Sequence, residues 1–237
     1  MILRLGLLAA TLLLGACAHT PPDDPSDPLE RANRAVFKFN RTADRYVLRP
    51  VAQGYDQVVP DPAKRGVNNF FNNLEEPRTI LNALLQLKVK RAARSTGRFL
   101  LNSTAGIAGF MDVATDAGLK RYDEDFGQTL GRYGVGQGWY LMLPFLGPRT
   151  NRDLIGSGGD YFTGIGAYVE TEVSTPLTAA DLVDTRARLL GADSLLDSAI
   201  DPYIFVRTAY LQQRLAKVYD GDPPRELMYG DYGDEGE

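Results

Sequence analysis

Cysteine and histidine often supply nucleophiles, general bases and metal ligands, and each occurs once in this chain of 237 residues, as Cys17 and His19. Their place near the N-terminus excludes a Ser-His-Asp triad and histidine metal ligands in the body of the chain. A carboxylate pair remains possible for acid–base chemistry. The candidates are Asp112, Glu124, Asp125, Asp153 and Asp160. Because carboxylates usually lie at the surface or cap helices, the sequence favours a protein that is not an enzyme and binds no cofactor or metal.

Cys17 follows a segment with the layout of a secretory signal peptide. Residues 1–16 carry one cation and then an apolar run, which is shorter than the roughly 20 residues needed to cross a bilayer. In Leu14-Gly15-Ala16-Cys17, small residues precede a thiol that a diacylglycerol can alkylate, as in a lipobox. We therefore predict cleavage before Cys17 and a lipid anchor on it, with an ordinary signal peptide as the alternative. Ala18, where aspartate would favour the inner membrane, indicates anchoring at the periplasmic face of the outer membrane.

Composition divides the rest of the chain into a tether, a body and a tail. Residues 17–26 contain three prolines, which suits an extended tether between the lipid and the domain. Residues 27–220 form the predicted domain. Residues 221–237 are acidic and rich in glycine, and we predict that they are disordered. The formal net charge of −4 is concentrated in this tail, which argues against nucleic acid as a partner.

The elements that must position any site are helices, because strand-like alternation is scarce. Three of the predicted helices begin at an Asp-Pro pair, which combines a good N-cap with a favoured first residue. Asp27 also has Glu30 three residues later, as in a capping box, and Gly191 is placed to end the fifth helix. The predicted helices span about 28–47, 61–72, 76–86, 88–103, 177–190 and 202–219, so the fold class is all-α.

The segment 28–47 is the clearest amphipathic helix. Apolar residues recur at three- and four-residue steps, and basic residues recur in the same way on nearly the opposite side. In a protein held at a membrane, such a basic stripe would lie near lipid phosphates. Arg34, Lys38 and Arg41 are the candidates for this contact. The alternative is a core helix with a solvated basic face.

A second feature is the density of glycine between residues 127 and 138. Its glycines are Gly127, Gly131, Gly134, Gly136 and Gly138. Their spacing does not match G-x-G-x-x-G, and no clear strand precedes them, so a phosphate-binding loop is disfavoured. Glycine permits positive φ and close backbone approach, so we predict a flexible loop or hairpin that acts as a hinge.

Several stretches in the body resemble the VacJ/MlaA family of outer-membrane lipoproteins. They are Asp27-Pro28-Leu29-Glu30-Arg31-Ala32-Asn33-Arg34, Phe37-Lys38-Phe39-Asn40, Asn73-Leu74-Glu75-Glu76-Pro77, Phe99-Leu100-Leu101-Asn102-Ser103-Thr104-Ala105-Gly106, Asp125-Phe126-Gly127-Gln128-Thr129-Leu130-Gly131, Tyr133-Gly134-Val135-Gly136, Leu143-Pro144, Asp201-Pro202-Tyr203-Ile204 and Arg207-Thr208-Ala209-Tyr210. They follow the family order over nearly the whole body. Two positions depart from the pattern, because Trp139 stands where proline is usual and Arg149 where a small residue is usual.

This resemblance implies a single ring- or disc-shaped helical domain in the inner leaflet of the outer membrane, with an amphipathic central channel. It implies a protein that sits against a porin trimer, removes phospholipid that has strayed into the outer leaflet and passes it to a soluble periplasmic carrier. Two alternatives remain from the residues themselves. The protein could be an envelope scaffold that transports nothing, or an enzyme that hydrolyses lipid.

A phospholipid passage needs polar groups for the head and apolar surroundings for the tails, because a bare ion in hydrocarbon is strongly disfavoured. Amide side chains beside aromatic ones offer that mixture. The candidates are Asn33, Phe37, Asn40, Phe99 and Asn102. The alternative is that these asparagines are ordinary packing residues that are satisfied by hydrogen bonds.

Overall fold

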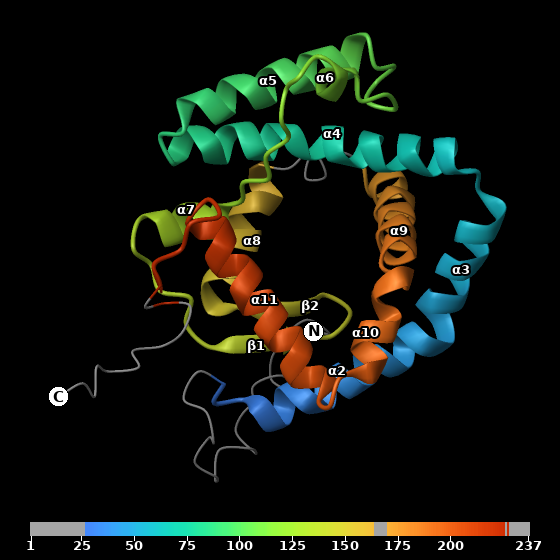
Figure 1. Cartoon of the computed structure of the whole chain (residues 1–237), viewed down its shortest axis with the longest axis vertical. Helices are drawn as coiled ribbons and strands as arrows, with labels where there is room; N and C mark the ends of the chain where they lie inside the picture. Colours follow the sequence, from blue (N-terminus) through green and yellow to red (C-terminus); the bar gives the residue numbers. More distant parts are fainter. Residues whose placement is uncertain (1–26, 164–169, 226, 228–237) are drawn as a thin grey trace.

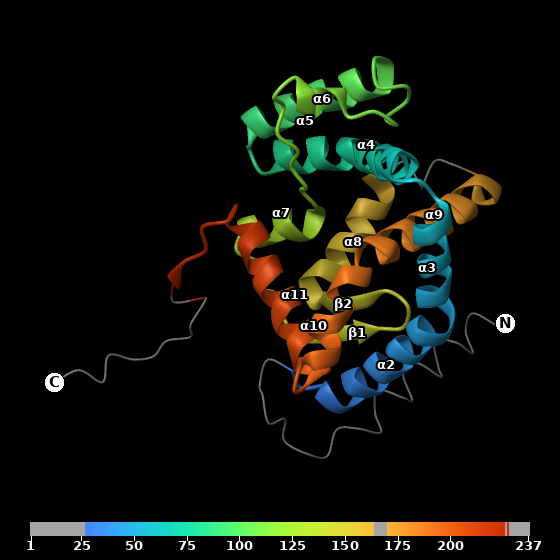
Figure 2. The same cartoon turned by 45° about the vertical axis from the view of Figure 1, so that its right-hand side comes forward.

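The computed structural model describes residues 27–163, 170–225 and 227. Within these residues the chain forms a ring of helices (Figure 1), and the view turned by 45° shows the same closed circuit (Figure 2). None of the described helices is both long enough and apolar enough to cross a membrane. The predicted signal peptide, the anchor on Cys17, the tether and most of the acidic tail lie outside the described residues.

The first part of the ring is a long helical arc. Helix α2 (Glu30–Ala43) continues through a π-helical turn, η1 (Asp44–Leu48), into α3 (Arg49–Val58). Helix α4 (Asp61–Leu85) forms one side of the ring, and α5 (Val89–Thr104) packs along its outer side with the short α6 (Val113–Asp116) (Figure 1).

The second part returns along the opposite side of the ring. Helix α7 (Phe126–Arg132) precedes a two-stranded antiparallel hairpin of β1 (Tyr140–Leu143) and β2 (Gly147–Thr150), in which Tyr140 pairs with Thr150 and Leu143 with Gly147. Helix α8 (Asn151–Thr163) follows β2 directly and packs on α7.

The last elements line and close the ring. Helix α9 (Thr171–Arg188) lies beside α3, and a 3-10 turn, η3 (Leu190–Ala192), leads into α10 (Asp193–Ser198). Helix α11 (Pro202–Val218) contacts α7, α10 and β2. The helical ring confirms the predicted fold class for the described residues, with the hairpin as its only strand pair.

Four local predictions about helix ends were wrong. Asp61 is the first residue of α4, whose N-cap is Pro60. Pro77 lies inside α4, because α5 and α9 pack along this helix and hold it continuous where two helices were expected. Helix α9 ends at Arg188, before Gly191. Asp27 caps nothing with its side chain and is instead fully buried. Asp201 does cap α11, because its carboxylate accepts hydrogen bonds from the backbone N–H of Tyr203 and Ile204.

The interior of the described ring is mostly polar. Nineteen buried residues are polar or charged and nine are hydrophobic, and five of those nine are alanines. Large apolar side chains lie outside instead, among them Val58, Leu87 and Phe145, each more than 70% exposed. Buried polar groups must be hydrogen-bonded or paired to be tolerated, so the ring depends on side-chain networks where most soluble proteins depend on apolar packing.

A small apolar cluster joins the first and last elements. Tyr140, Met142 and Tyr203 form its buried centre, against which Phe37 and Tyr210 pack. Beside it, Asp27 accepts hydrogen bonds from the Tyr203 hydroxyl and, at 3.4 Å, from Nη1 of Arg207. Residues 176 positions apart in the chain are therefore in direct contact, and this contact closes the ring.

Candidate functional site

A polar hollow of about 260 Å³ lies where α4, α7, α8, β2 and α11 meet. Its lining combines cations and carboxylates with neutral hydrogen-bonding groups. The lining residues are Arg78, Asp123, Asp125, Arg149, Asp153, Ser157, Asp160, Tyr210, Gln213, Arg214 and Lys217. A hollow of this composition can bind a charged group but offers little contact to hydrocarbon.

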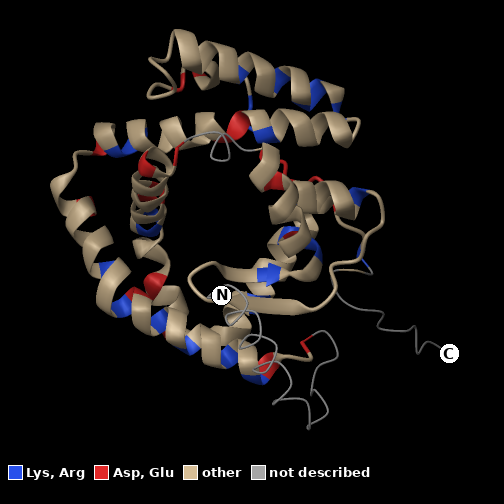
Figure 3. Cartoon of the chain, turned by 180° about the vertical axis from the view of Figure 1, so that it is seen from behind, with Lys and Arg blue, Asp and Glu red and all other residues tan. Residues whose placement is uncertain are grey.

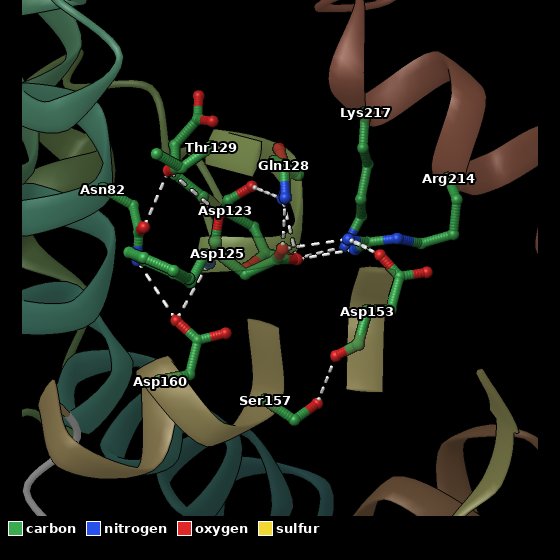
Figure 4. A network of polar contacts seen from close by, with 12 residues as sticks. Asn82, Asp123, Asp125, Gln128, Thr129, Asp153, Ser157, Asp160, Arg214 and Lys217 are labelled. Carbon is green, nitrogen blue, oxygen red and sulfur yellow. Dashed lines mark hydrogen bonds and ion pairs between the residues drawn. The ribbon is translucent and has the colours of Figure 1, made fainter. Parts of the chain in front are cut away.

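Arg214 is the central cation of the hollow (Figure 4). Its Nη1 and Nη2 atoms donate to both oxygens of Asp125, at 2.6 and 2.9 Å, and Nη2 also donates to Asp153 Oδ1 at 2.6 Å. Burial of Asp125 opposes its ionisation, but hydrogen bonds and charge attraction from Arg214 outweigh that effect and hold the pKa of this carboxyl well below its usual range. Asp125 also caps α7 by accepting from the backbone N–H of Gln128 at 2.8 Å, so the ion pair fixes α11 against the start of α7.

The other carboxylates of the hollow also have partners. Asp123 pairs with Lys217 at 2.5 Å and with Arg78 at 3.0 Å. Asp160 accepts from the Asn82 amide at 3.2 Å and from the backbone N–H of Phe126 at 3.0 Å, while burial raises its pKa. All five carboxylates considered for acid–base chemistry have such partners. The two outside the hollow are Asp112, which pairs with Arg98, and Glu124, which pairs with Lys88 and Arg91.

Arg149 is the cation of the hollow that has no carboxylate partner among the described residues. Its Nη1 atom donates to the neighbouring carbonyl of Pro148 at 2.8 Å. Strand β2 places Arg149 opposite Leu141 in the hairpin, and Tyr210, Gln213 and the rest of the lining surround it. A planar guanidinium of this kind binds phosphate or carboxylate through two parallel hydrogen bonds, so Arg149 is the group in the hollow best suited to an anion.

Two of the predicted passage residues bind the hairpin instead. The Asn33 amide donates to Tyr140 O at 3.0 Å and to Asp27 at 2.8 Å, and its oxygen accepts from Met142 N at 2.8 Å. The Asn40 amide donates to Leu143 O and its oxygen accepts from Phe145 N, both at 2.9 Å. Because an isolated two-stranded hairpin is marginally stable, these two amides fix its position on α2.

Replacement of Asn40 by leucine should therefore loosen the hairpin turn. The change leaves Leu143 O and Phe145 N without their side-chain partner, at a cost of about 0.5–1.5 kcal/mol, because the turn is exposed and water can replace the amide. Hydrogen exchange at the backbone amides of residues 143–147 would measure the effect. Thr42→Val is a matched control, since Thr42 bonds only within its own helix, to Lys38 O. Unchanged exchange in the Asn40 variant would contradict the role given to this amide.

The other predicted passage residues do not meet in one place. Phe37 packs edge-on against Tyr203 in the apolar cluster, with ring centroids 5.8 Å apart. Asn102 is buried in α5 and bonds Asp112 and the backbone of Ala114. Burial opposes ionisation of Asp112, but hydrogen bonds from Thr115, Asn102 and Arg98 outweigh it and lower the pKa to about 2. Phe99 is half-buried on the same helix. The structure therefore gives Phe37 and Asn102 packing roles, in agreement with the alternative that was left open.

The glycines of the expected hinge belong to two different structures. Gly127 and Gly131 lie inside α7, where a Cβ atom would come within 2.7 Å of Arg214 and 2.9 Å of Arg152. These two are therefore helical, and the prediction that they belong to a loop was wrong. Gly134, Gly136 and Gly138 follow the helix, and Gly134 has a φ of +85°. The loop comprises residues 133–139, between α7 and β1, and its movement stays a prediction.

The basic stripe of α2 is partly used by ion pairs. Figure 3 shows basic residues repeated along the α2–η1–α3 arc. Arg34 pairs with Glu30 at 2.6 Å and with Asp201 at 2.8 Å, and Arg41 pairs with Asp197 at 2.6 Å. Lys38 is exposed. Two of the three candidates for lipid phosphates therefore hold α2 against the α10–α11 segment, and simultaneous charge reversal would disturb folding as well as any membrane contact.

The residues of the hollow were missed as a set, because they come from five elements. The sequence carried one usable indication, since Asp125 precedes a helix in a motif that also contains Gly127 and Gln128. Nothing in the sequence indicated that Arg214, 89 residues later, would be its partner.

Comparison with known proteins agrees with this architecture. Residues 25–217 match the MlaA lipoprotein family. The intermembrane phospholipid transport system lipoprotein MlaA of Escherichia coli (strain K12) is 42% identical over 220 residues, which cover 90% of this chain and 88% of the relative. The protein of the same name from Haemophilus influenzae is 38% identical, with 91% and 89% covered.

A solved structure from work on the structural basis for maintenance of bacterial outer membrane lipid asymmetry is also similar. It is 41% identical, matches with a TM-score of 0.75, and the match covers 83% of this chain and all of that chain. The resemblance seen in the sequence is confirmed: this chain belongs to the MlaA lipoprotein family.

Proposed function

We propose that this protein is an outer-membrane lipoprotein, anchored through Cys17 at the periplasmic face, that removes phospholipid from the outer leaflet and passes it to a soluble periplasmic carrier. The observation that carries the proposal is its similarity over 90% of the chain to a relative named as an intermembrane phospholipid transport system lipoprotein. A porin trimer is the proposed neighbour in the membrane. Hydrolysis is not part of the proposal.

The distribution of polarity supports a position in lipid. Side chains that would be buried in a soluble protein are exposed on several elements, including Val47, Val51, Leu87, Ile155 and Phe162. Exposed apolar area costs about 25 cal/mol per Å² in water, and extended apolar surfaces usually mark contact with a membrane or another protein. The buried ion pairs fit the same environment, because charged groups in lipid face the protein interior and pair there.

The polar hollow supports contact with a lipid head. Arg149 offers its guanidinium to a phosphate, while Asp160, Ser157 and Gln213 offer groups that can accept or donate hydrogen bonds at a zwitterionic or hydroxylated head. The hollow holds polar groups in a structure that exposes many large apolar side chains on its described surface. Such an arrangement lets the head leave water without the full cost of desolvation, which is the requirement for an amphipathic passage.

The test is the lipid composition of the outer leaflet in a deletion strain that carries plasmid-borne variants. Deletion should let phospholipid accumulate in the outer leaflet and make cells sensitive to detergent, and the intact gene should reverse both effects. Arg149→Glu should restore about a tenth of wild-type function or less, because loss of a charge-assisted contact costs about 1.5–3 kcal/mol. Arg65→Glu, at an exposed arginine in the first turn of α4, should complement fully.

Different outcomes identify the competing functions. Normal outer-leaflet lipid in the deletion strain, with no redundant route, would favour a scaffold that transports nothing. Free fatty acid released by the purified protein from phospholipid vesicles would favour a hydrolase. Co-purification with porin and with a soluble periplasmic protein, lost on deletion of the tether and anchor, would test the proposed partners.

A further inference from the structure

A second and larger cavity, of about 780 Å³, lies between α11 and the segment that follows α7. Its walls are mainly apolar and include Val135, Leu211, Leu215, Ala216 and Leu227, with backbone contributed by the glycines of residues 131–136. Sites for small organic ligands typically have volumes of about 300–1,000 Å³ and walls of this kind. The cavity is therefore large enough for an acyl chain.

Helix α11 separates this cavity from the polar hollow. Tyr210, Gln213, Arg214 and Lys217 line the hollow, whereas residues 211, 212, 215, 216, 218 and 219 line the apolar cavity. At 3.6 residues per turn these two sets occupy opposite faces of the helix. Helix α11 thus presents polar side chains to the hollow and mainly apolar side chains to the cavity. The cavity is therefore a separate site and not an extension of the hollow.

One cation lines the apolar cavity, and its hydrogen bonding is incomplete. Arg152 is 7% exposed, and its Nε atom has no hydrogen-bond partner among the described residues. Nη1 donates to Val135 O at 3.2 Å. The nearest carboxylate oxygen, Asp153 Oδ1, is 3.7 Å from Nε and is already bound by Arg214 at 2.6 Å.

A buried guanidinium without a close carboxylate of its own is unfavourable, and an anion bound in the cavity would stabilise its charge. The cavity that Arg152 lines is open enough to admit such an anion and apolar enough to hold a hydrocarbon chain beside it. A phosphate that carries an acyl-bearing group satisfies both requirements, whereas a free phosphate leaves the apolar walls in contact with water. A neutral lipid would contact the apolar walls but leave the guanidinium without a counter-ion.

We infer that this cavity is a second lipid-binding site, in which an acyl chain of a phospholipid lies along α11 and the phosphate binds Arg152. The inference rests on the proposed function, which supplies phospholipid to the protein, and it adds a holding site on the opposite side of α11 from the hollow. Gly131 is part of the site, because a Cβ atom there would come within 2.9 Å of Nη1 of Arg152 and would displace the guanidinium.

Photolabelling of the full-length purified protein tests the site directly. The probe is phosphatidylglycerol with a diazirine at the end of one acyl chain, and the comparison is diacylglycerol with the same chain. Phosphatidylglycerol should label the cavity face of α11 (residues 211, 212, 215, 216, 218 and 219) at least about tenfold more than diacylglycerol, since hydrogen bonds to a charged group distinguish the two lipids. Ala216→Trp should fill the cavity and abolish the labelling, whereas Ala209→Trp, at an exposed position of the same helix, should not change it.

The role of Arg152 is tested with two variants. Arg152→Gln should remove the preference for phosphatidylglycerol, and Arg152→Lys should retain it, because the charge remains. Thermal unfolding of each variant is measured in the same detergent to confirm folding. Labelling of the cavity face of α11 that survives Ala216→Trp, or equal labelling of that face by the two lipids in the unmodified protein, would overturn the inference.

The same experiment separates this inference from the proposed function. Labelling near Ser157 and Tyr210 without labelling on the cavity face of α11 would reject the second site and leave phospholipid transport intact. Labelling on the cavity face of α11 in a protein whose deletion leaves outer-leaflet lipid unchanged would reject transport and leave the lipid site.

Discussion

Replacement of Arg214 by methionine should lower the free energy of unfolding by about 3–5 kcal/mol, because it leaves two buried carboxylates without their cation. Arg214 is 9% exposed, and its partners Asp125 and Asp153 are 15% and 6% exposed. Urea unfolding in a fixed detergent would measure the change. The control is Arg41→Met, which removes an ion pair to Asp197 whose side chains are 34% and 44% exposed, and should cost about 1 kcal/mol or less.

The effect of the Arg214 change should depend on pH. Arg214 keeps the pKa of Asp125 low against the opposing effect of burial, so this pair stabilises the wild-type protein above the pKa of an unfolded aspartate, about 3.9. That stabilisation is lost as pH falls through the lowered pKa of the folded protein. The difference in stability between wild type and variant should therefore be greatest near neutral pH and shrink below about pH 4. A difference that is constant from pH 7 to pH 3 would contradict this assignment.

Replacement of Gly156 by alanine should separate α7 from α8 and lower the free energy of unfolding by about 1–3 kcal/mol, with larger values possible for overpacked contacts. A Cβ atom at Gly156 would lie 2.4 Å from the backbone nitrogen and 2.7 Å from the Cα atom of Gly127. Neither backbone atom can move without shifting α7. Thermal unfolding monitored by circular dichroism would measure the loss.

The same helix provides a matched control for this substitution. Gly158 is also in α8, but nothing lies within 4 Å of the position of its Cβ. Gly158→Ala should raise stability by about 0.5–1 kcal/mol, since alanine loses less backbone entropy than glycine in a helix. Opposite signs for two glycine substitutions two residues apart would identify the α7–α8 contact as the cause. Equal effects would show that helix propensity alone decides both.

Local sequence features predicted part of the helical structure. The three- and four-residue spacing of apolar residues predicted α2, and Asp201 before Pro202 predicted the start of α11. No predicted helix corresponded to α3, α8 or α10. Periodicity indicates which residues share a face of one helix. It does not indicate whether that face contacts solvent, lipid or another part of the protein. The basic stripe of α2 illustrates this limit, because Arg34 and Arg41 contact Asp201 and Asp197, whose proximity depends on closure of the ring.

The polar hollow and the apolar cavity could not be predicted in the same way. The hollow requires Asp125, Asp153 and Arg214 to meet from three elements, and sequence spacing carries no information about that meeting. The asparagines of α2 were predicted to contact lipid because amide side chains can hydrogen-bond to a lipid head. The same side chains hydrogen-bond to backbone groups equally well. Glycine was ambiguous for a similar reason, because Gly127 serves close packing whereas Gly134 adopts a positive φ.

Closure of the ring through Asp27 has a consequence for how the chain folds. Two of the side chains that bond this buried carboxylate, Tyr203 and Arg207, are synthesised 176 and 180 positions later. Bringing such distant segments together costs about 4–5 kcal/mol of chain entropy before other contacts offset it, and contacts of this sequence separation slow folding. Every shorter nascent chain therefore holds an open arc in which Asn33 can bond Asp27 but Tyr203 and Arg207 are absent. A chain that stops before α11 therefore cannot close its ring through Asp27, so only the complete chain adopts the ring.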